Sequence, residues 1–261
     1  MTIYNESCLV TMDRLPDNHI DLVVTSPPYD NLRNYHGIEW NEDVWQAVIA
    51  GLYRVIKVGG TVVWVVADAT VNGSETGSSF KQALYFKEVG FNIHDTMIWQ
   101  KPNFTNPSFT RYHQTFEYMM IFTKGKPKTF NPINDRKNIT AGATRTGRNT
   151  HRGKDGTLKE RPKKIVTEFG MRHNVWYLNT SSCEAPFKSI EHPATFPEQL
   201  ANDHIISWSN PGDLVYDPFL GSGTTMVVAL RNGRNCIGSE LSEEYCRIAT
   251  SRCEEYSLVC A

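Results

Sequence analysis

A short apolar run near the start of the chain ends in a stiff turn that is rich in hydrogen-bond acceptors. The run Ile20 to Thr25 contains β-branched residues and has the length of a strand, and Ser26-Pro27-Pro28-Tyr29 follows it. Each proline lacks a backbone donor and fixes its own φ, so the turn is rigid and presents carbonyl acceptors. Such a turn suits a group that only donates, for example an exocyclic amino group. Taken alone, the tetrapeptide is also compatible with a purely structural strand-to-loop turn.

A second run with potential for chemistry lies near the other end of the chain. Asp213 to Asp217 predicts a strand, a glycine-containing turn follows it, and Thr224 to Leu230 has the composition of a buried helix. Gly221 and Gly223 allow a ligand to approach the backbone closely, and free N–H groups at the start of the next helix attract a carboxylate. The run lacks the Gly-Lys-Ser/Thr of a P-loop, and the glycine pattern of a dinucleotide site is incomplete.

An acidic residue follows the second run at a distance that is typical of nucleoside binding. Asn235 to Leu241 predicts the next strand, and Glu240 lies near its end. In a strand, turn and helix unit, a carboxylate about 20 residues after the glycines binds ribose hydroxyls. We therefore assign that role to Glu240. The alternative is a glycine turn beside a glutamate that faces solvent.

The two runs resemble the catalytic and cofactor-binding motifs of the S-adenosylmethionine-dependent DNA amino-methyltransferases. Their order along the chain resembles the permuted β class of that family. A third run, His192-Pro193-Ala194-Thr195-Phe196-Pro197-Glu198, resembles the segment that precedes the glycine loop in that family and folds over the cofactor. The resemblance covers most of the chain, because three separated motifs agree.

The resemblance implies transfer of a methyl group to the amino nitrogen of a base that is flipped out of the DNA helix. The implied catalytic residues are Ser26, Pro27, Pro28 and Tyr29. In this family the serine side chain and the first proline's carbonyl accept the amino hydrogens, and the tyrosine stacks on the base. Cytosine N4 is the favoured target, because Ser-Pro-Pro-Tyr resembles the cytosine enzymes, whereas the adenine enzymes more often have Asp-Pro-Pro-Tyr. Adenine N6 remains the alternative.

The resemblance also implies a set of residues that bind S-adenosylmethionine. Phe196 would cover the adenine or methionine moiety, and His192 or Thr195 would reach the carboxylate. Ser7 stands where many relatives carry an acid that contacts the adenine. A bulkier residue at Gly223 is expected to obstruct the cofactor. The implied set is Asp217, Pro218, Phe219, Gly221, Ser222, Gly223, Thr224, Thr225, Glu240, Leu241, His192, Thr195, Phe196, Ser7 and Cys8.

Helix and strand patterns alternate between these motifs. Trp40 to Lys57 has apolar residues at helical spacing and is expected to end at Gly59-Gly60, before the strand Thr61 to Val66. Further alternation predicts a helix over Phe80 to Phe86, and strands over Ile93 to Gln100 and Glu117 to Phe122. Alternation of this kind predicts an α/β, Rossmann-like methyltransferase fold, in which a mostly parallel twisted sheet has helices on both faces.

Charge is distributed unevenly along the chain, although the net charge is only −1. Residues 124–172 contain 14 Lys or Arg against 4 Asp or Glu, so the rest of the chain is acidic. We predict a basic target-recognition insertion at 124–186, between a catalytic half at 1–123 and a cofactor-binding half at 187–261. The alternative is a solvated basic loop without a role in DNA binding. The candidate DNA-binding residues are Arg136, Lys137, Arg145, Arg148, Arg152, Lys154, Lys163 and Lys164.

Composition disfavours several other classes of protein. The six cysteines form no Cys-x-x-Cys pair, which argues against a zinc site, and no cysteine follows a proline as in enzymes that methylate carbon 5 of cytosine. Without a signal peptide or a long apolar run, a cytoplasmic protein with no membrane partner is expected. The expected partner is double-stranded DNA, and a homodimer and a cognate restriction nuclease are further possibilities. RNA or protein methylation and a non-catalytic DNA-binding module remain competing hypotheses.

Overall fold

The computed structural model of the protein describes residues 1–29, 40–104, 107, 109–144, 150–160, 164–180 and 196–259. The chain divides into two compact units. The first unit combines Met1–Asn131 with Asn174–Ala261, and the second is Pro132–His173. No helix in the described ranges is long and apolar enough to cross a membrane.

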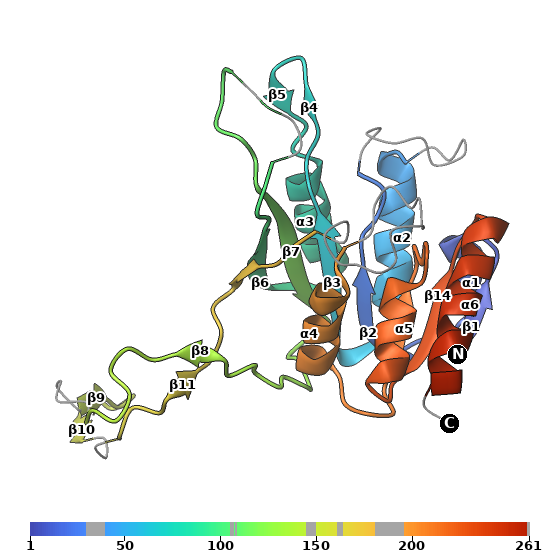
Figure 1. Ribbon diagram of the computed structural model, residues 1–261. Coiled ribbons are helices and arrows are strands. Elements are labelled where there is room, and N and C mark those ends of the chain that lie inside the picture. Colours follow the sequence, from blue (N-terminus) through green and yellow to red (C-terminus); the bar gives the residue numbers. More distant parts are fainter. Residues whose placement is uncertain are drawn as a thin grey trace. The chain divides into compact units, whose positions relative to one another are not determined.

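An eight-stranded sheet forms the centre of the first unit (Figure 1). From one edge to the other its strands are β1 (Thr2–Tyr4), β14 (Asn235–Ser239), β13 (Leu214–Asp217), β2 (Ile20–Thr25), β3 (Ile56–Val66), β7 (Phe116–Thr123), β6 (Asn92–Gln100) and β12 (Val175–Tyr177). All neighbours are parallel except at β7, which runs antiparallel to both β3 and β6. The prediction of a mostly parallel sheet is therefore confirmed.

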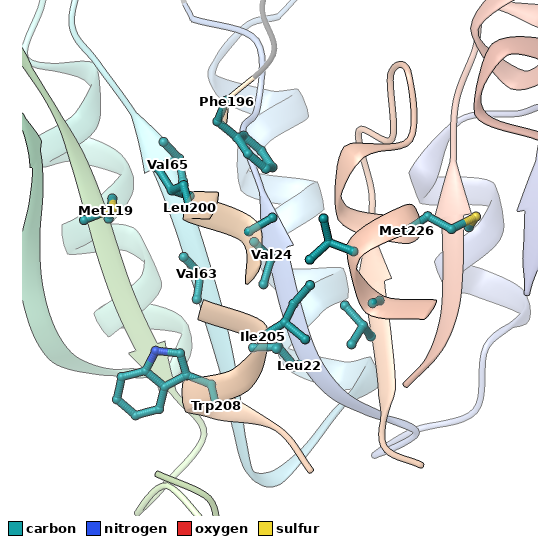
Figure 2. Close-up of a cluster of buried hydrophobic side chains, with 14 of the residues drawn as sticks. Leu22, Val24, Val63, Val65, Met119, Phe196, Leu200, Ile205, Trp208 and Met226 are labelled. Atoms are coloured by element: carbon teal, nitrogen blue, oxygen red, sulfur yellow. The ribbon is translucent and has the colours of Figure 1, made fainter. Parts of the chain in front are cut away.

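Helices cover both faces of this sheet. They are α1 (Cys8–Arg14), α2 (Glu42–Val55), α3 (Ser78–Val89), α4 (Glu198–Trp208), α5 (Thr224–Arg231) and α6 (Glu243–Val259). Successive strand residues point to opposite faces, so the wholly apolar runs of β2 and β3 supply two cores. Leu22 and Val24 belong to one core with α4 and α5, as Figure 2 shows. Val23 and Trp64 belong to the other core with α1, α2 and α3. The predicted α/β fold is confirmed.

The glycine pair Gly59-Gly60 does not end the helix that precedes it, and this expectation was wrong. Helix α2 already ends at Val55, and the glycines lie inside β3, next to a register shift in the β2–β3 ladder. Gly59 has φ +86°, and a Cβ at Gly60 would lie 2.9 Å from the Asp21 carbonyl of β2. The pair is therefore required by a strand irregularity and by the close approach of β2.

The order of the strands brings together the two motifs that are far apart in the sequence. Strands β2 and β13 are parallel neighbours, with Leu22 paired to Val215 and Val23 to Tyr216. Since parallel strands end at the same edge of a sheet, the turn after Thr25 and the loop after Asp217 leave side by side. Ligands of open α/β sheets bind at this carboxyl edge.

The second unit consists of short antiparallel ladders. Strands β8 (Arg136–Lys137) and β11 (Phe169–Gly170) pair, as do β9 (Thr150–Arg152) and β10 (Leu158–Glu160). No side chain among those described in this unit is buried. The Arg172 guanidinium lowers the pKa of the Asp135 carboxyl through their hydrogen bonds. Backbone ladders and such polar contacts, rather than an apolar core, hold the described part of this unit.

Candidate active site

A buried hydrogen bond joins the two motif loops. The Thr25 hydroxyl donates to Asp217 Oδ1 at 2.6 Å, across 192 residues of sequence. The same carboxylate oxygen accepts the Phe219 N–H at 3.0 Å, and the Thr225 hydroxyl donates to the Val24 carbonyl at 3.1 Å. Asp217 therefore fixes both the start of the glycine loop and its position against the end of β2.

Burial raises the pKa of the Asp217 carboxyl to about 6, although hydrogen bonds from Thr25 and Thr225 oppose the shift. In the unfolded chain the value is near 3.8, so between about pH 4 and 6 the folded protein binds more protons. We therefore expect the free energy of unfolding to rise as the pH falls from 7 to 4, relative to an Asp217→Asn variant. The slope approaches about 1.4 kcal/mol per pH unit. Urea unfolding of both proteins measures it, and parallel curves would contradict the assignment.

The Ser26 turn is connected by hydrogen bonds to a buried acid on another strand. The Ser26 hydroxyl donates to Tyr29 Oη at 3.0 Å, and the Tyr29 hydroxyl donates to Glu117 Oε2 at 2.7 Å. Lys101 forms an ion pair with the other carboxylate oxygen of Glu117, which is only 8% exposed. Because the Ser26 proton is directed at Tyr29, the lone pairs of Ser26 Oγ can accept a hydrogen from a ligand.

The turn prolines and Phe219 shape the apolar surroundings of this turn. Pro27 is buried, whereas Pro28 is half-buried. Pro218 is buried as well, and the half-buried Phe219 ring makes edge contacts with Trp40 and Trp64 at centroid distances of 5.3 and 6.3 Å. Phe219 therefore packs the start of the glycine loop against the core that contains Trp40 and Trp64.

The glycine loop bends as its two glycines allow. Gly221 and Gly223 have φ values of +53° and +84°, in the region that other residues rarely adopt. The Gly221 N–H donates to Glu240 Oε2 at 2.8 Å, and the Ser242 N–H donates to Glu240 Oε1 at 2.8 Å. Each carboxylate oxygen has a second lone pair, so Glu240 can hold the loop and still accept from hydroxyl groups of a ligand.

Arg252 of α6 supports the loop from behind. Its guanidinium donates to the Ser222 carbonyl at 2.7 Å, and lies 3.3 Å from Ser222 Oγ and 3.4 Å from Thr224 Oγ1. Glu198 of α4 pairs with the same guanidinium at 2.9 Å. The side chains of Ser222 and Thr224 are buried, as is that of Thr225. Their hydroxyls thus make contacts within the protein. The N–H groups of Gly221 and Gly223 are bonded as well, to Glu240 and to the Leu220 carbonyl. The start of α5 therefore offers backbone N–H donors toward a ligand.

The residues before α1 contact the turn that holds Glu240 through Asn5, which was not predicted as a site residue. Asn5 Nδ2 donates to the carbonyls of Glu240 at 3.0 Å and Leu241 at 2.9 Å. Ser7 instead caps α1, since its Oγ accepts the Leu9 N–H at 3.3 Å. Cys8 is buried, and burial raises the pKa of its thiol to about 12, so it remains protonated.

Two of the three predicted residues in the His192 run lie outside the described residues, namely His192 and Thr195. Phe196 is described. Its ring is buried in the core that α4 shares with β2 and β3, and Figure 2 shows it beside Val65 and Val24 near the ends of those strands.

Most of the candidate DNA-binding residues described in the second unit have exposed side chains. These are Arg136, Lys137, Lys154 and Lys164. Arg136 also donates to the Met171 carbonyl at 3.0 Å. Arg152 lies in β9. Arg145, Arg148 and Lys163 lie outside the described residues.

Four residues of this site were not predicted from the sequence, namely Glu117, Lys101, Asn5 and Arg252. For Glu117 a signal exists in the sequence, because a single acid begins the otherwise apolar run Glu117 to Phe122. A charged residue at the start of a buried strand requires a partner. The other three are recognised only through contacts that the fold creates.

Comparison with known proteins identifies the family. Residues 20–251 match the model of the N6/N4 DNA methylase family. The orphan methyltransferase M.BamHII of Bacillus amyloliquefaciens is 50% identical over 250 residues, covering 95% of this chain and 93% of that protein. The type II methyltransferase M.BglII of Bacillus subtilis is 26% identical over 260 residues, covering 95% of this chain and 67% of that protein.

Solved structures share the fold. The PvuII DNA methyltransferase, described as cytosine-N4-specific, superposes with a TM-score of 0.70 at 22% identity, covering 98% of this chain and 90% of its own. The M1.HpyAVI–SAM complex gives a TM-score of 0.64 at 22% identity, covering 96% of this chain and 98% of its own. Together, fold and site define an α/β protein of the methyltransferase type. The chain belongs to the N6/N4 DNA methylase family and is a DNA methyltransferase.

Proposed function

We propose that the protein transfers the methyl group of S-adenosylmethionine to the N4 amino group of a cytosine flipped out of double-stranded DNA. The observation that carries this proposal is the junction between Thr25 and Asp217, which sets the Ser26 turn beside the glycine loop. A base on the turn and a methyl donor on the loop would then lie close together, and proximity supplies much of the rate. The order of the motifs supports membership of the permuted β class.

The residues proposed for the cofactor surround the glycine loop. S-adenosylmethionine, when bound, supplies an electrophilic methyl group on a sulfonium. Backbone N–H groups at the start of α5 would bind its carboxylate, and Glu240 would accept from its ribose hydroxyls. Phe196 would cover the adenine or methionine side of the pocket. Other residues proposed to line or support this pocket are Asp217, Pro218, Phe219, Leu241, Ser7 and Cys8, with His192 and Thr195.

Transfer to an amino group releases one proton, and the hydrogen bonds around Ser26 provide a path for it. Ser26 Oγ would accept the proton that the nitrogen loses when the methyl group passes from sulfur to nitrogen. Ser26 passes its own proton to Tyr29, and Tyr29 passes its proton to Glu117, in the direction in which these hydroxyls already donate. Lys101 balances the charge of the carboxylate before transfer. The Pro27 carbonyl accepts the second amino hydrogen, Pro28 stiffens the turn, and the Tyr29 ring stacks on the base.

Replacement of Glu117 by Gln tests this path. The shape is kept but the proton acceptor is lost, so we expect about a 100-fold lower rate of transfer. The variant should bind the cofactor as the wild type does. Tyr29→Phe should cause a similar loss that does not add to that of Glu117→Gln, because both break one chain. Single-turnover rates of the two single variants and of the double variant measure this.

The control for Glu117→Gln is Glu243→Gln, which removes an acid from an exposed ion pair with Arg247. We expect this variant to keep the wild-type rate, since an exposed pair contributes little. Losses that add in the double variant of Glu117→Gln and Tyr29→Phe would contradict the proposed relay, even if each single variant were slower.

Cytosine is proposed as the target because Ser26-Pro27-Pro28-Tyr29 matches the motif of cytosine-specific enzymes. The PvuII DNA methyltransferase, which shares the fold, is itself described as cytosine-N4-specific. The alternative is adenine N6, which would use the same turn, the same relay and the same cofactor site.

Recognition of the DNA sequence is proposed for the basic insertion at 124–186, between the halves at 1–123 and 187–261. The compact unit Pro132–His173 falls inside these bounds, and its described basic side chains are mostly exposed. A segment with basic residues and no buried core among its described residues suits ordering on a charged partner. The proposed contacts are Arg136, Lys137, Arg145, Arg148, Arg152, Lys154, Lys163 and Lys164.

The test incubates the purified protein with diverse duplex DNA and methyl-labelled S-adenosylmethionine, followed by nucleoside digestion and mass spectrometry. We expect labelled 4-methylcytosine. Labelled 6-methyladenine would move the target to adenine and leave the relay in place. Absence of any labelled base, with RNA or protein labelled instead, would overturn the proposal, and binding of DNA without cofactor binding would favour a non-catalytic module.

A further inference from the structure

The connection between β6 and β7 carries aromatic side chains that project fully into solvent. Phe109 is 100% exposed and Tyr112 is 98% exposed, although large apolar rings are usually covered. Phe104 is also exposed and lies 3.9 Å, between ring centroids, from His113. Residues 101–115 contain Lys101, Arg111 and His113 but no Asp or Glu. We call the described residues of this connection, 101–104, 107 and 109–115, the aromatic loop.

The aromatic loop is anchored to a second hairpin. That hairpin consists of β4 (Thr70–Val71) and β5 (Ser74–Glu75) and follows β3. The Arg111 guanidinium donates to the Gly73 carbonyl, lies 3.3 Å from Thr70 Oγ1 and pairs with Glu75 at 3.6 Å. Figure 1 shows the β4–β5 hairpin and the β6–β7 connection extending from the same end of the sheet. The exposed rings therefore lie on a loop that is held from one side.

The aromatic loop begins next to the site proposed for the flipped nucleobase. Lys101 begins the loop, its N–H donates to the Thr115 carbonyl at 2.7 Å, and its ammonium pairs with Glu117, which accepts from Tyr29. Strand β2 is parallel to β3, and β6 also runs parallel to β3 because β7 between them is antiparallel to both. Strands β6 and β2 therefore end at the same edge of the sheet. The connection between β6 and β7 can run about seven residues away from the sheet and about seven back, which gives it a reach of up to about 20 Å. This reach exceeds the width of the major groove of DNA.

We propose that the aromatic loop contacts the DNA duplex beside the flipped base, with Phe109 and Tyr112 stacking on bases exposed by the flip. This inference rests on the proposed function and adds a DNA contact outside the basic insertion. A base that leaves the helix exposes the faces of its neighbours and of its former partner, and apolar or aromatic side chains inserted at such steps offset part of the lost stacking. The absence of carboxylates keeps the loop compatible with nearby phosphates.

The test uses Phe109→Ala, Tyr112→Ala and the double variant, with S-adenosylhomocysteine bound. Leu84→Ala is the matched control, because Leu84 is an exposed apolar residue of α3. The probes are a short duplex carrying the sequence methylated in the mass-spectrometric assay, and the same duplex with the target base mispaired. Fluorescence anisotropy gives the affinity, and 2-aminopurine at the target position reports flipping.

We expect the double variant to bind the paired duplex about 5- to 100-fold more weakly and to flip the base less. The loss should be smaller on the mispaired duplex, whose target base is already easier to extrude. Cofactor affinity and thermal stability should match those of the wild type and of Leu84→Ala.

Wild-type affinity and flipping in the double variant would overturn the inference. Equal losses on both duplexes would also overturn it, because a contact tied to flipping must depend on pairing. A changed sedimentation coefficient with unchanged DNA binding would assign the rings to a contact between copies of the chain. If the wild-type protein neither methylates nor binds DNA, the proposed function fails, a result that is distinguishable from failure of the loop variants alone.

Discussion

Replacement of Ser26 by Ala is expected to lower the rate of methyl transfer by about 100- to 1,000-fold and to leave cofactor affinity largely unchanged. The hydroxyl is proposed to accept an amino hydrogen, and it connects the target base to Tyr29 and Glu117. Its loss removes both the acceptor and the first step of the proton path. The glycine loop is held by Asp217 and Thr25 instead, so the cofactor site does not depend on this hydroxyl.

Single-turnover transfer of labelled methyl groups and calorimetric titration of S-adenosylmethionine separate these two effects. The control is Thr123→Ala, which also removes a bonded hydroxyl, since Thr123 Oγ1 donates to the Gly125 carbonyl at 2.8 Å. Thr123 ends β7, which is antiparallel to β3, so this contact lies at the edge of the sheet opposite the Ser26 turn. An unchanged rate in Ser26→Ala, or an equal loss in Thr123→Ala, would show that Ser26 has no part in transfer.

The sequence predicted the architecture because the strand signals were strong. Apolar residues occupy every position of the run Leu22 to Val24, so both faces of that strand had to be covered, and the two cores are the result. The antiparallel direction of β7 did not follow from alternation, because pattern alone does not distinguish a hairpin from a crossover when the connection spans residues 101–115.

The glycine pair at Gly59 shows how a local signal is misread when tertiary context decides. A double glycine after a helical pattern is a common helix end. Here the requirement comes from the neighbouring strand, because the Asp21 carbonyl leaves no room for a Cβ at Gly60. The distance between β2 and β3 at this point depends on the fold and cannot be predicted from the local sequence.

The motif residues were predictable from type and spacing, whereas the residues that hold them were not. Thr25 and Asp217 stand at the ends of strand-like runs, but only the strand order makes them neighbours. Glu117 accepts a hydrogen bond from Tyr29, 88 residues away in the sequence, and pairs with Lys101, 16 residues away. Supporting residues of this kind are defined by distance in space and leave little trace in local sequence pattern.

The second large effect is expected at Gly223, where even Ala should abolish cofactor binding at attainable concentrations. The reason is a steric clash between the glycine loop and helix α6. A Cβ at Gly223 would lie 2.7 Å from Ala249 Cβ and 3.0 Å from Ala249 Cα of α6, and the residue has φ +84°. Backbone strain of about 1–2 kcal/mol and overpacking of about 1–3 kcal/mol combine, so the loop or α6 must move.

Gly212→Ala is the matched control, because Gly212 has a similar φ of +86° but nothing within 4 Å of its Cβ position. It should lose only the strain, about 1–2 kcal/mol of unfolding free energy, and keep cofactor affinity. Adding Ala249→Gly to Gly223→Ala removes the nearer contact and should restore part of the affinity. Calorimetric titration and urea unfolding measure both quantities. If Gly223→Ala behaves like Gly212→Ala, contact with α6 does not shape the loop, and the glycine is required only for its backbone conformation.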